Sequence, residues 1–317
     1  MERIPLNRLD VAAQFLKEGR LVAFPTETVY GLGAMLFDPN AVRSLFIAKG
    51  RPADNPLIVH ISSITQVEEL AVEIPSLFYR LAKEVFPGPL TLVLRKHPRV
   101  PREATGGGET VAIRMPNHPV AHTLIDLVGQ PLVAPSANLS GRPSATMADH
   151  VICDFEGKIA GVVMGGRTEL GIESTVLSLV HAQPLLLRPG GCSRERIEQI
   201  LGEKIEIAGE HMQGKPLSPG MKYRHYAPKT PIRLFHSEAS LCSYLQQKQL
   251  LRCMVLSESF SLPLPKGADL FPLRASSLYM LYRLSEERKD EEILICIEDV
   301  DRIDSALKNR ILHSYTM

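Results

Sequence analysis

Residues 21–33 read LVAFPTETVYGLG. The first four form a short apolar run that is typical of a buried strand, and residues 25–33 follow it as a polar, glycine-containing segment. In α/β proteins, ligands bind in loops that leave the ends of strands. This order of strand and polar segment therefore predicts an α/β sheet with a binding site at a strand end.

The same order recurs along residues 1–210. Further polar clusters stand beside short apolar runs, at residues 49–60, 110–114, 136–144, 173–175 and 188–190. The expected helices cover residues 9–17 and 40–48, and the expected strands cover residues 21–24, 57–61, 90–94, 111–114, 131–134, 162–164, 174–179 and 184–187. Strands that alternate with helices predict a layered α/β domain with a mixed, twisted sheet flanked by helices.

Residues 211–231 differ in composition from both neighbouring parts of the chain. They contain four Pro, two Gly, four Lys or Arg and no acidic residue. Such a stretch is typical of a linker, although its Tyr and His content is unusual for a passive one. We therefore expect a catalytic domain at residues 1–210, a linker or lid at 211–231 and a second domain at 232–317.

The second domain alternates regularly between strands and helices. Strands are expected at residues 232–235, 253–256 and 293–297, and helices at 239–247, 276–288 and 302–313. This βαβ order predicts a small Rossmann-like α/β domain with a parallel sheet.

Composition excludes several classes of protein. The 36 Lys and Arg residues balance 35 Asp and Glu residues, so the net charge of +1 argues against strong, unspecific binding to nucleic acid. Apolar residues make up 44% of the chain without a run long enough for a membrane helix. The five cysteines are scattered and the first residues lack a secretory pattern, which together predict reduced thiols in a cytoplasmic protein.

The polar clusters contain fixed positive charge, hydroxyls and amides, but no evident pair of nucleophile and base. No Walker, dinucleotide-binding, zinc-protease or serine-hydrolase motif occurs. The cationic side chains are Lys49, Arg51, Arg114, Arg142 and Arg188. They suit an anionic ligand whose charge is spread over phosphate oxygens during transfer. Taken singly, each is as well explained as a surface charge, Ser136-x-Asn138 as a turn, and His60 as a core histidine.

Five stretches together resemble the YrdC-like threonylcarbamoyl-AMP synthases. They are PTETVYGLG (25–33), KGRP with NPLIVHI (49–61), APSANLSG (134–141), GIESTV (171–176) and LRPG (187–190). Lys49, Arg51, Ser136 and Asn138 match the family's hallmark tetrad, and SPGMKYRHYAP (218–228) is similar to the joint of its long, two-domain form. The resemblance is strong over residues 5–230 and weaker beyond.

The resemblance implies an enzyme that joins L-threonine, bicarbonate and ATP into threonylcarbamoyl-AMP and pyrophosphate, with Mg²⁺ bound to the ATP phosphates. A downstream tRNA threonylcarbamoyltransferase complex would then modify tRNA next to the anticodon, and weak contact with tRNA is possible on this view. N-carboxylated threonine would itself attack the α-phosphate, which fits a site without a protein nucleophile.

The resemblance also implies a role for each matching residue. Lys49, Arg51, Ser136 and Asn138 are expected to be catalytic. ATP would contact Lys49, Arg51, Asn55, Thr110, Ser136, Asn138, Ser144 and Arg188, with Tyr226 reaching the nucleotide from the linker. L-Threonine would contact Thr28, His60, Arg114, the backbone at Ala134, and Ser174, with Arg114 gripping the carboxylate. No protein ligand is assigned to the metal.

Three other functions remain open on the sequence alone. The chain could be an RNA-binding module without activity, a carbamoyl-transfer enzyme of hydrogenase maturation, or a regulatory nucleotide sensor. The second lacks the paired CxxC motifs that it would need. The third predicts ATP binding without turnover that depends on threonine.

Overall fold

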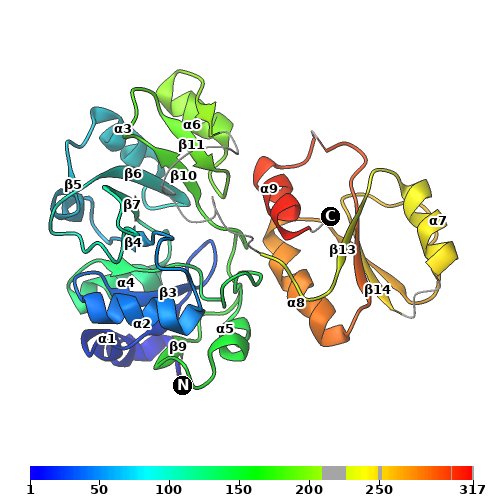
Figure 1. Ribbon diagram of the computed structural model, residues 1–317, viewed down its shortest axis with the longest axis horizontal. Coiled ribbons are helices and arrows are strands. Elements are labelled where there is room, and N and C mark those ends of the chain that lie inside the picture. Colours follow the sequence, from blue (N-terminus) through cyan, green and yellow to red (C-terminus); the bar gives the residue numbers. More distant parts are fainter. Residues whose placement is uncertain (209–225, 249–251, 301, 316–317) are drawn as a thin grey trace. The chain divides into compact units, whose positions relative to one another are not determined.

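The computed structural model describes residues 1–208, 226–248, 252–300 and 302–315. These residues form two compact units (Figure 1). Unit 1 comprises residues 1–140 and 144–208, and unit 2 comprises the short segment 141–143 and the described residues from 226 onward. Most of the expected linker, residues 211–225, lies outside the described residues.

Unit 1 is built from short strands and helices in alternation. Its helices are α1 (Leu9–Lys17), α2 (Pro39–Lys49), α3 (Ser76–Val85), α4 (Pro119–Val128), α5 (Ala148–Phe155) and α6 (Arg194–Leu201), with 3-10 turns η1 (Leu6–Arg8) and η2 (Ile64–Glu69). Its strands are β1 (Glu2–Ile4), β2 (Val22–Phe24), β3 (Gly31–Met35), β4 (Ile58–His60), β5 (Ala71–Val72), β6 (Leu90–Lys96), β7 (Thr110–Arg114), β8 (Leu132–Val133), β9 (Gly161–Val163), β10 (Thr175–Ser178), β11 (Leu185–Arg188) and β12 (Glu206–Ile207).

One mixed sheet joins all of these strands. Its order is β1-β9-β2-β3-β8-β4-β7-β6-β10-β11-β12, with β5 paired to β6 beside this path. Strands β4 and β7 run parallel, whereas β6 and β7 run antiparallel. The expected mixed sheet with flanking helices is confirmed.

Alternation of side chains along the strands explains how the sheet is buried. Val22 and Phe24 point to the face covered by α1 and α4, and Ala23 between them joins the larger core on the other face. Leu132 and Val133 divide in the same way. A strand covered on both faces must be apolar throughout, which is why the run from residue 21 to 24 shows no polar alternation.

The segment from residue 31 to 33 differs from expectation, because it is the start of strand β3 and not a loop. Gly31 pairs with Phe24 of the antiparallel strand β2. A Cβ atom on Gly33 would lie 2.8 Å from Cε1 of Phe24, so the ring needs the space that glycine leaves. Glycine in a strand often marks such a close approach, and here it resembles a loop in the sequence.

A smaller apolar cluster lies on strands β4, β6, β7 and β10. It contains Ile58, Val93, Ala112, Val176 and Leu187. Since side chains on one face recur at every second residue, the residues two positions along these strands share this face. The candidate site described below extends this cluster.

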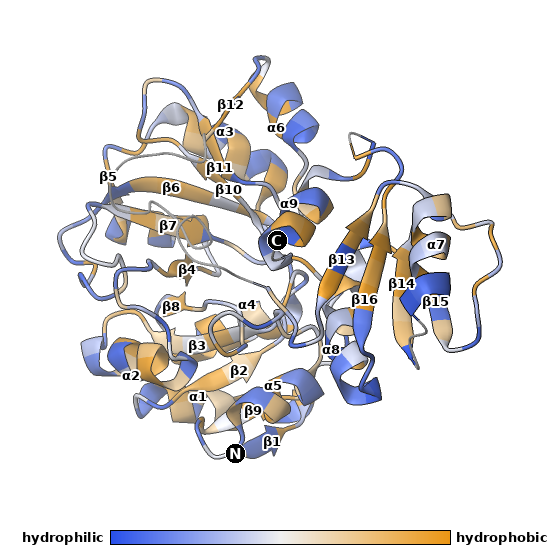
Figure 2. Cartoon of the chain, turned by 45° about the vertical axis from the view of Figure 1, so that its right-hand side comes forward, coloured by the Kyte–Doolittle hydropathy of each residue, from blue (hydrophilic) through white to orange (hydrophobic). Residues whose placement is uncertain are grey.

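Unit 2 contains a parallel sheet of the order β13-β16-β14-β15. The strands are β13 (Ile232–Phe235), β14 (Cys253–Ser257), β15 (Ala268–Pro272) and β16 (Glu292–Cys296), and the helices are α7 (Glu238–Lys248), α8 (Leu278–Arg288), preceded by the 3-10 turn η3 (Ala275–Ser277), and α9 (Ser305–Ser314). The strands of both units are mainly hydrophobic, whereas the helices carry hydrophilic residues (Figure 2). The expected parallel α/β sheet is confirmed, with β15 as an additional strand.

Among the described residues, no helix combines the length and the apolar character that crossing a membrane requires.

Candidate active site

Lys49 is the last residue of α2, and its amine is buried within unit 1. Its side chain is 3% exposed. Nζ donates to the carbonyl oxygens of Ser136 and Asn138, both at 2.5 Å. In return, the Ser140 N–H donates to the Lys49 carbonyl at 2.9 Å. The amine therefore fixes the backbone of the segment that carries Ser136 and Asn138.

Asp154 on α5 supports the same segment from another side. Its carboxylate accepts the Leu139 N–H at 3.2 Å. Burial and the charge of Arg51 hold the pKa of Lys49 well below its ordinary value, and the nearby Asp154 charge acts in the opposite direction. Sequence reasoning missed Asp154, because no local pattern connects a helical aspartate with a loop 15 residues away.

Arg51 orders the turn that leads to β4. Its Nε donates to the Asn55 carbonyl at 3.2 Å and its Nη2 to the Pro56 carbonyl at 2.8 Å. The Asn55 side chain is 2% exposed, and neither its amide nitrogen nor its oxygen has a partner among the described residues. Buried polar atoms without partners are rare in proteins, so this amide is well suited to hydrogen-bond a ligand.

His60 and Arg114 lie side by side at the ends of the parallel strands β4 and β7. His60 is 2% exposed, and its Nδ1 lies 3.3 Å from the Ile58 carbonyl oxygen. A carbonyl only accepts, so Nδ1 carries the proton and Nε2 is left as an acceptor. Burial and the charge of Arg114 lower the pKa of His60 to about 3, which keeps the imidazole neutral.

A buried ion pair holds the Arg114 guanidinium. Its Nη2 lies 2.7 Å from Oε2 of Glu27, and both side chains are almost completely buried. Nε of Arg114 donates to the Gly88 carbonyl at 3.3 Å. Burial alone would raise the pKa of Glu27, but Arg114 and the backbone N–H of Asn117 outweigh it and hold the pKa below its usual range. Sequence reasoning assigned Glu27 no role, although it stands directly before Thr28.

Ser174 and Arg188 form the third group, at the ends of β10 and β11. Nη2 of Arg188 donates to the Ser174 carbonyl at 2.9 Å and to Oγ at 3.3 Å. Oγ of Ser174 also lies 2.8 Å from Oγ1 of Thr91 on β6. Next to it, the buried Glu173 carboxylate accepts the Ser144 hydroxyl. These contacts link Arg188 and Ser144, which are expected to contact ATP, with Ser174 and its neighbour Glu173; Ser174 is expected to contact threonine.

Strand alternation places His60, Arg114 and Thr110 on one face of the sheet. His60 lies two residues after Ile58, and Arg114 two residues after Ala112, so both extend the apolar cluster of that face. Thr110 lies on the same face of β7, four residues from Arg114. At about 3.4 Å per residue, the two positions are about 14 Å apart along the strand.

The two remaining threonine-site candidates are buried near β4 and β2. The Ala134 N–H donates to the Ile58 carbonyl at 3.0 Å. Thr28 is fully buried, and its Oγ1 lies 2.8 Å from Oγ1 of Thr26. Both positions are therefore fixed by unit 1 itself.

Tyr226 differs from the other candidates because it belongs to unit 2. It is 7% exposed, and its ring stacks on Tyr279 with the centroids 5.5 Å apart. The guanidinium of Arg310 lies over the same ring, 5.1 Å from its centroid. In the described structure, this side chain therefore packs within unit 2.

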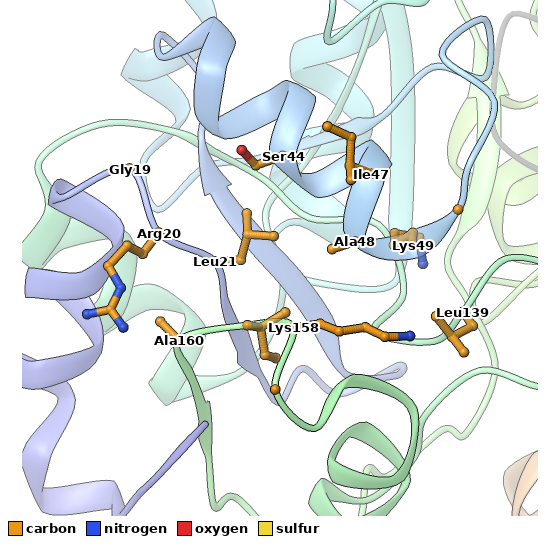
Figure 3. A pocket seen from close by; sticks show the side chains of 13 residues that line it. Gly19, Arg20, Leu21, Ser44, Ile47, Ala48, Lys49, Leu139, Lys158 and Ala160 are labelled. Atoms are coloured by element: carbon orange, nitrogen blue, oxygen red, sulfur yellow. The ribbon is translucent and has the colours of Figure 1, made fainter.

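A cavity of about 820 Å³ adjoins Lys49 (Figure 3). Arg20, Lys158, Leu139 and Ile47 are among its lining residues. Of the candidate residues, only Lys49 contributes to this lining, so the cavity is separate from the face that carries His60 and Arg114.

Two family models cover most of the chain. One, described as "Telomere recombination" and named for Sua5, YciO and YrdC, matches residues 14–190. The other, described as "Threonylcarbamoyl-AMP synthase, C-terminal domain", matches residues 192–314. The chain belongs to the threonylcarbamoyl-AMP synthase family. The expected enzyme class, a nucleotidyltransferase, is thereby confirmed.

Individual relatives agree with this family. The chain is 56% identical to a threonylcarbamoyl-AMP synthase of Pyrococcus abyssi, in an alignment that covers 73% of this chain and 68% of that protein. It is 50% identical to the Bacillus subtilis threonylcarbamoyl-AMP synthase, covering 75% and 69% respectively. The solved structure of P. abyssi Sua5 complexed with L-threonine matches 99% of this chain and 96% of its own, with a TM-score of 0.90 and 42% identity.

The neutral His60 predicts that stability falls as the pH is lowered. The folded state binds this proton only near pH 3, whereas an unfolded histidine binds it near 6.5. Between these values the unfolded chain holds up to one more proton, so the free energy of unfolding should fall by up to about 1.4 kcal/mol per pH unit on acidification. Above pH 6.5 this contribution is fully present.

Urea unfolding between pH 5 and 7.5 measures this effect. We expect the free energy of unfolding to depend less steeply on pH in His60→Asn than in wild type, by up to about 1.4 kcal/mol per pH unit. His181 is exposed, so His181→Asn should keep the wild-type dependence. Identical slopes for His60→Asn and wild type would show that the imidazole is not held neutral.

Proposed function

We propose that this protein is an L-threonylcarbamoyladenylate synthase. It would combine L-threonine, bicarbonate and ATP into threonylcarbamoyl-AMP and pyrophosphate. The observation that carries the proposal is that His60 and Arg114 lie buried side by side on a sheet face that also bears Thr110, with Glu27 paired to Arg114. The match to a relative complexed with L-threonine supports it further.

The threonine end of the site follows from the charges of these residues. The Arg114 guanidinium would bind the substrate carboxylate, because its planar donors match two carboxylate oxygens. Nε2 of His60 would accept a hydrogen bond from the hydroxyl or the amino group. Glu27 keeps the guanidinium in place, and Thr28, Ala134 and Ser174 would complete the contacts.

The nucleotide end would use the segments that Lys49 and Arg51 fix. Ser136, Asn138, Asn55 and Thr110 offer hydroxyls and amides, and Ser144 and Arg188 stand nearest the threonine end. Positioning is the main requirement in phosphoryl transfer, and here rigid, hydrogen-bonded loops would supply it.

The reaction then needs no protein nucleophile. The threonine amine and bicarbonate give a carbamate with loss of water. A carbamate oxygen forms a bond to the α-phosphorus of ATP, the bond from that phosphorus to the bridging oxygen breaks, and pyrophosphate leaves. Arg188 and the backbone N–H groups of the loops would stabilise the charge on the transferred phosphate.

Mg²⁺ would enter with ATP. Its ligands would be mainly phosphate oxygens and water. The ion would neutralise charge on the triphosphate.

The product is a reactive mixed anhydride that a second enzyme must consume. We propose that a tRNA threonylcarbamoyltransferase complex receives it and modifies adenosine beside the anticodon, in the cytoplasm. Contact of this chain with tRNA would be weak, in line with the net charge of +1.

Pyrophosphate release from ATP tests the proposal. We expect release only when threonine and bicarbonate are both present, and none when serine or valine replaces threonine. Release without threonine would indicate an ATPase or another acceptor, and ATP binding without release would favour a nucleotide sensor.

The buried pair of Glu27 and Arg114 gives a second prediction. The double variant Glu27→Gln with Arg114→Gln removes both charges, so it should fold while the KM for threonine rises at least about tenfold. The KM for ATP should stay within about twofold. Arg114→Gln alone leaves the Glu27 carboxylate unpaired and should also lose about 3–5 kcal/mol of stability.

Steady-state kinetics and urea unfolding measure these quantities. The exposed pair of Arg99 and Glu69 provides the matched control, because replacing both with Gln removes the same charges at the surface. A threonine KM that is equal in the buried double variant and this control would refute the assignment.

A further inference from the structure

The hydroxyl of Thr26 is buried in the bend that follows strand β2. Thr26 is 1% exposed. Its Oγ1 lies 2.6 Å from the Val29 carbonyl oxygen and 2.8 Å from Oγ1 of Thr28, and it accepts the Thr28 N–H at 3.2 Å. Threonine hydroxyls commonly bind backbone groups a few residues away and so hold a turn of the chain. One side chain therefore fixes the bend from residue 26 to residue 29.

These three contacts determine which atom donates in each hydrogen bond. A hydroxyl has one proton to donate and two lone pairs with which to accept. Because the Val29 carbonyl can only accept, the Thr26 hydroxyl donates its proton to that carbonyl. The two lone pairs of Thr26 are then left for the N–H and the hydroxyl of Thr28. The Thr28 hydroxyl is therefore the donor of the pair, and its only proton is directed at Thr26.

Thr28 can consequently offer a substrate only the lone pairs of its Oγ1. His60 has the same polarity, since its Nδ1 carries the proton beside the Ile58 carbonyl and Nε2 is left to accept. The guanidinium of Arg114, in contrast, can only donate. The candidate threonine site therefore combines a donor group with acceptors at two other positions.

Free L-threonine presents the complementary pattern. Its carboxylate accepts hydrogen bonds, whereas its hydroxyl and amino groups carry protons that they can donate. A buried acceptor that receives no proton costs free energy, so a site of fixed polarity discriminates against a ligand of the wrong polarity. A fixed acceptor at Thr28 therefore favours a ligand that places an O–H or N–H group there.

Glu27 stands between the two threonines, and unit 1 holds it by separate contacts. The Leu170 N–H donates to the Glu27 carbonyl at 2.8 Å. The Glu27 carboxylate is held by its ion pair with Arg114. Removal of the Thr26 hydroxyl would therefore leave these contacts of Glu27 in place and act first on Thr28.

We propose that Thr26 is a positioning residue for L-threonine, because its hydroxyl takes the proton of Thr28 and so keeps Oγ1 of Thr28 as an acceptor for the substrate. This inference rests on the proposed synthase function. Thr28 then accepts a hydrogen bond from the hydroxyl or the amino group of the substrate. Thr26 thereby has a part in threonine recognition that it exerts through its neighbour.

Thr26→Val in the full chain tests the proposal, since valine keeps the shape of threonine without its hydroxyl. The Thr28 hydroxyl then loses its acceptor and can turn its proton toward the substrate, so the KM for threonine should rise at least about fivefold. The KM for ATP should change by less than about twofold. Thr26→Ser retains the hydroxyl and should keep the KM for threonine within about twofold of wild type.

A double-mutant cycle separates this role from general damage. If Thr26 acts through Thr28, adding Thr26→Val to a protein that already carries Thr28→Val should change the KM for threonine by less than about twofold. Circular dichroism and thermal unfolding establish that the variants are folded. Thr26→Ala removes the same hydroxyl and should give the same result as Thr26→Val, which keeps the test decisive if the valine variant does not fold.

Thr230→Val is the matched control. Thr230 belongs to unit 2 and is also a buried threonine, whose Oγ1 accepts the Ser285 hydroxyl at 3.0 Å. This variant loses a buried, hydrogen-bonded hydroxyl as Thr26→Val does, but it should keep the wild-type KM for threonine and for ATP.

The outcomes distinguish this inference from the proposed function. If wild type makes threonylcarbamoyl-AMP and a folded Thr26→Val or Thr26→Ala variant keeps the wild-type KM for threonine, the positioning role is wrong and the synthase stands. An effect of Thr26→Val that persists undiminished in the Thr28→Val background likewise overturns the positioning role. If wild type makes no threonylcarbamoyl-AMP from threonine, bicarbonate and ATP, both are wrong.

Discussion

The amine of Lys49 lies in the interior of unit 1, where a polar group must find hydrogen-bond partners. It finds them in the carbonyls of Ser136 and Asn138, so helix α2 and the loop after β8 have to meet at this point. Asp154 and the Ser140 N–H complete the same junction. The buried amine thus determines the course of the loop that carries the nucleotide-site candidates.

The buried guanidinium of Arg114 is satisfied in a different way. Arg114 has a carboxylate partner, Glu27, and its neighbour His60 remains neutral. One fixed charge pair beside one uncharged acceptor is well suited to a substrate with its own carboxylate and hydroxyl. The alternation of β7 places this group on the same face as Thr110, and the length of the strand sets the separation of the two ends of the site.

The sequence predicts the parts of this structure that depend on local patterns. Helices α1 and α2 and the βαβ order of unit 2 follow from the pattern of apolar residues along the sequence. The sequence predicts a loop at residues 31–33 because glycine there resembles a turn. Only the fold shows that glycine in strand β3 leaves room for the ring of Phe24. Glu27, Asp154 and Glu173 were missed as contacts, since each meets a partner at least 15 residues away in the chain.

Chemical labelling of lysines tests the buried junction most directly. Lys49 and Lys158 adjoin the same cavity, but Lys158 is exposed whereas the Lys49 amine is buried and hydrogen-bonded. Brief reductive methylation followed by peptide mass spectrometry should modify Lys49 at least about a hundredfold more slowly than Lys158, because a buried, hydrogen-bonded amine reacts only when the structure opens. Equal rates would contradict the account, because the Lys49 amine could not then be buried against the loop that it is held to fix.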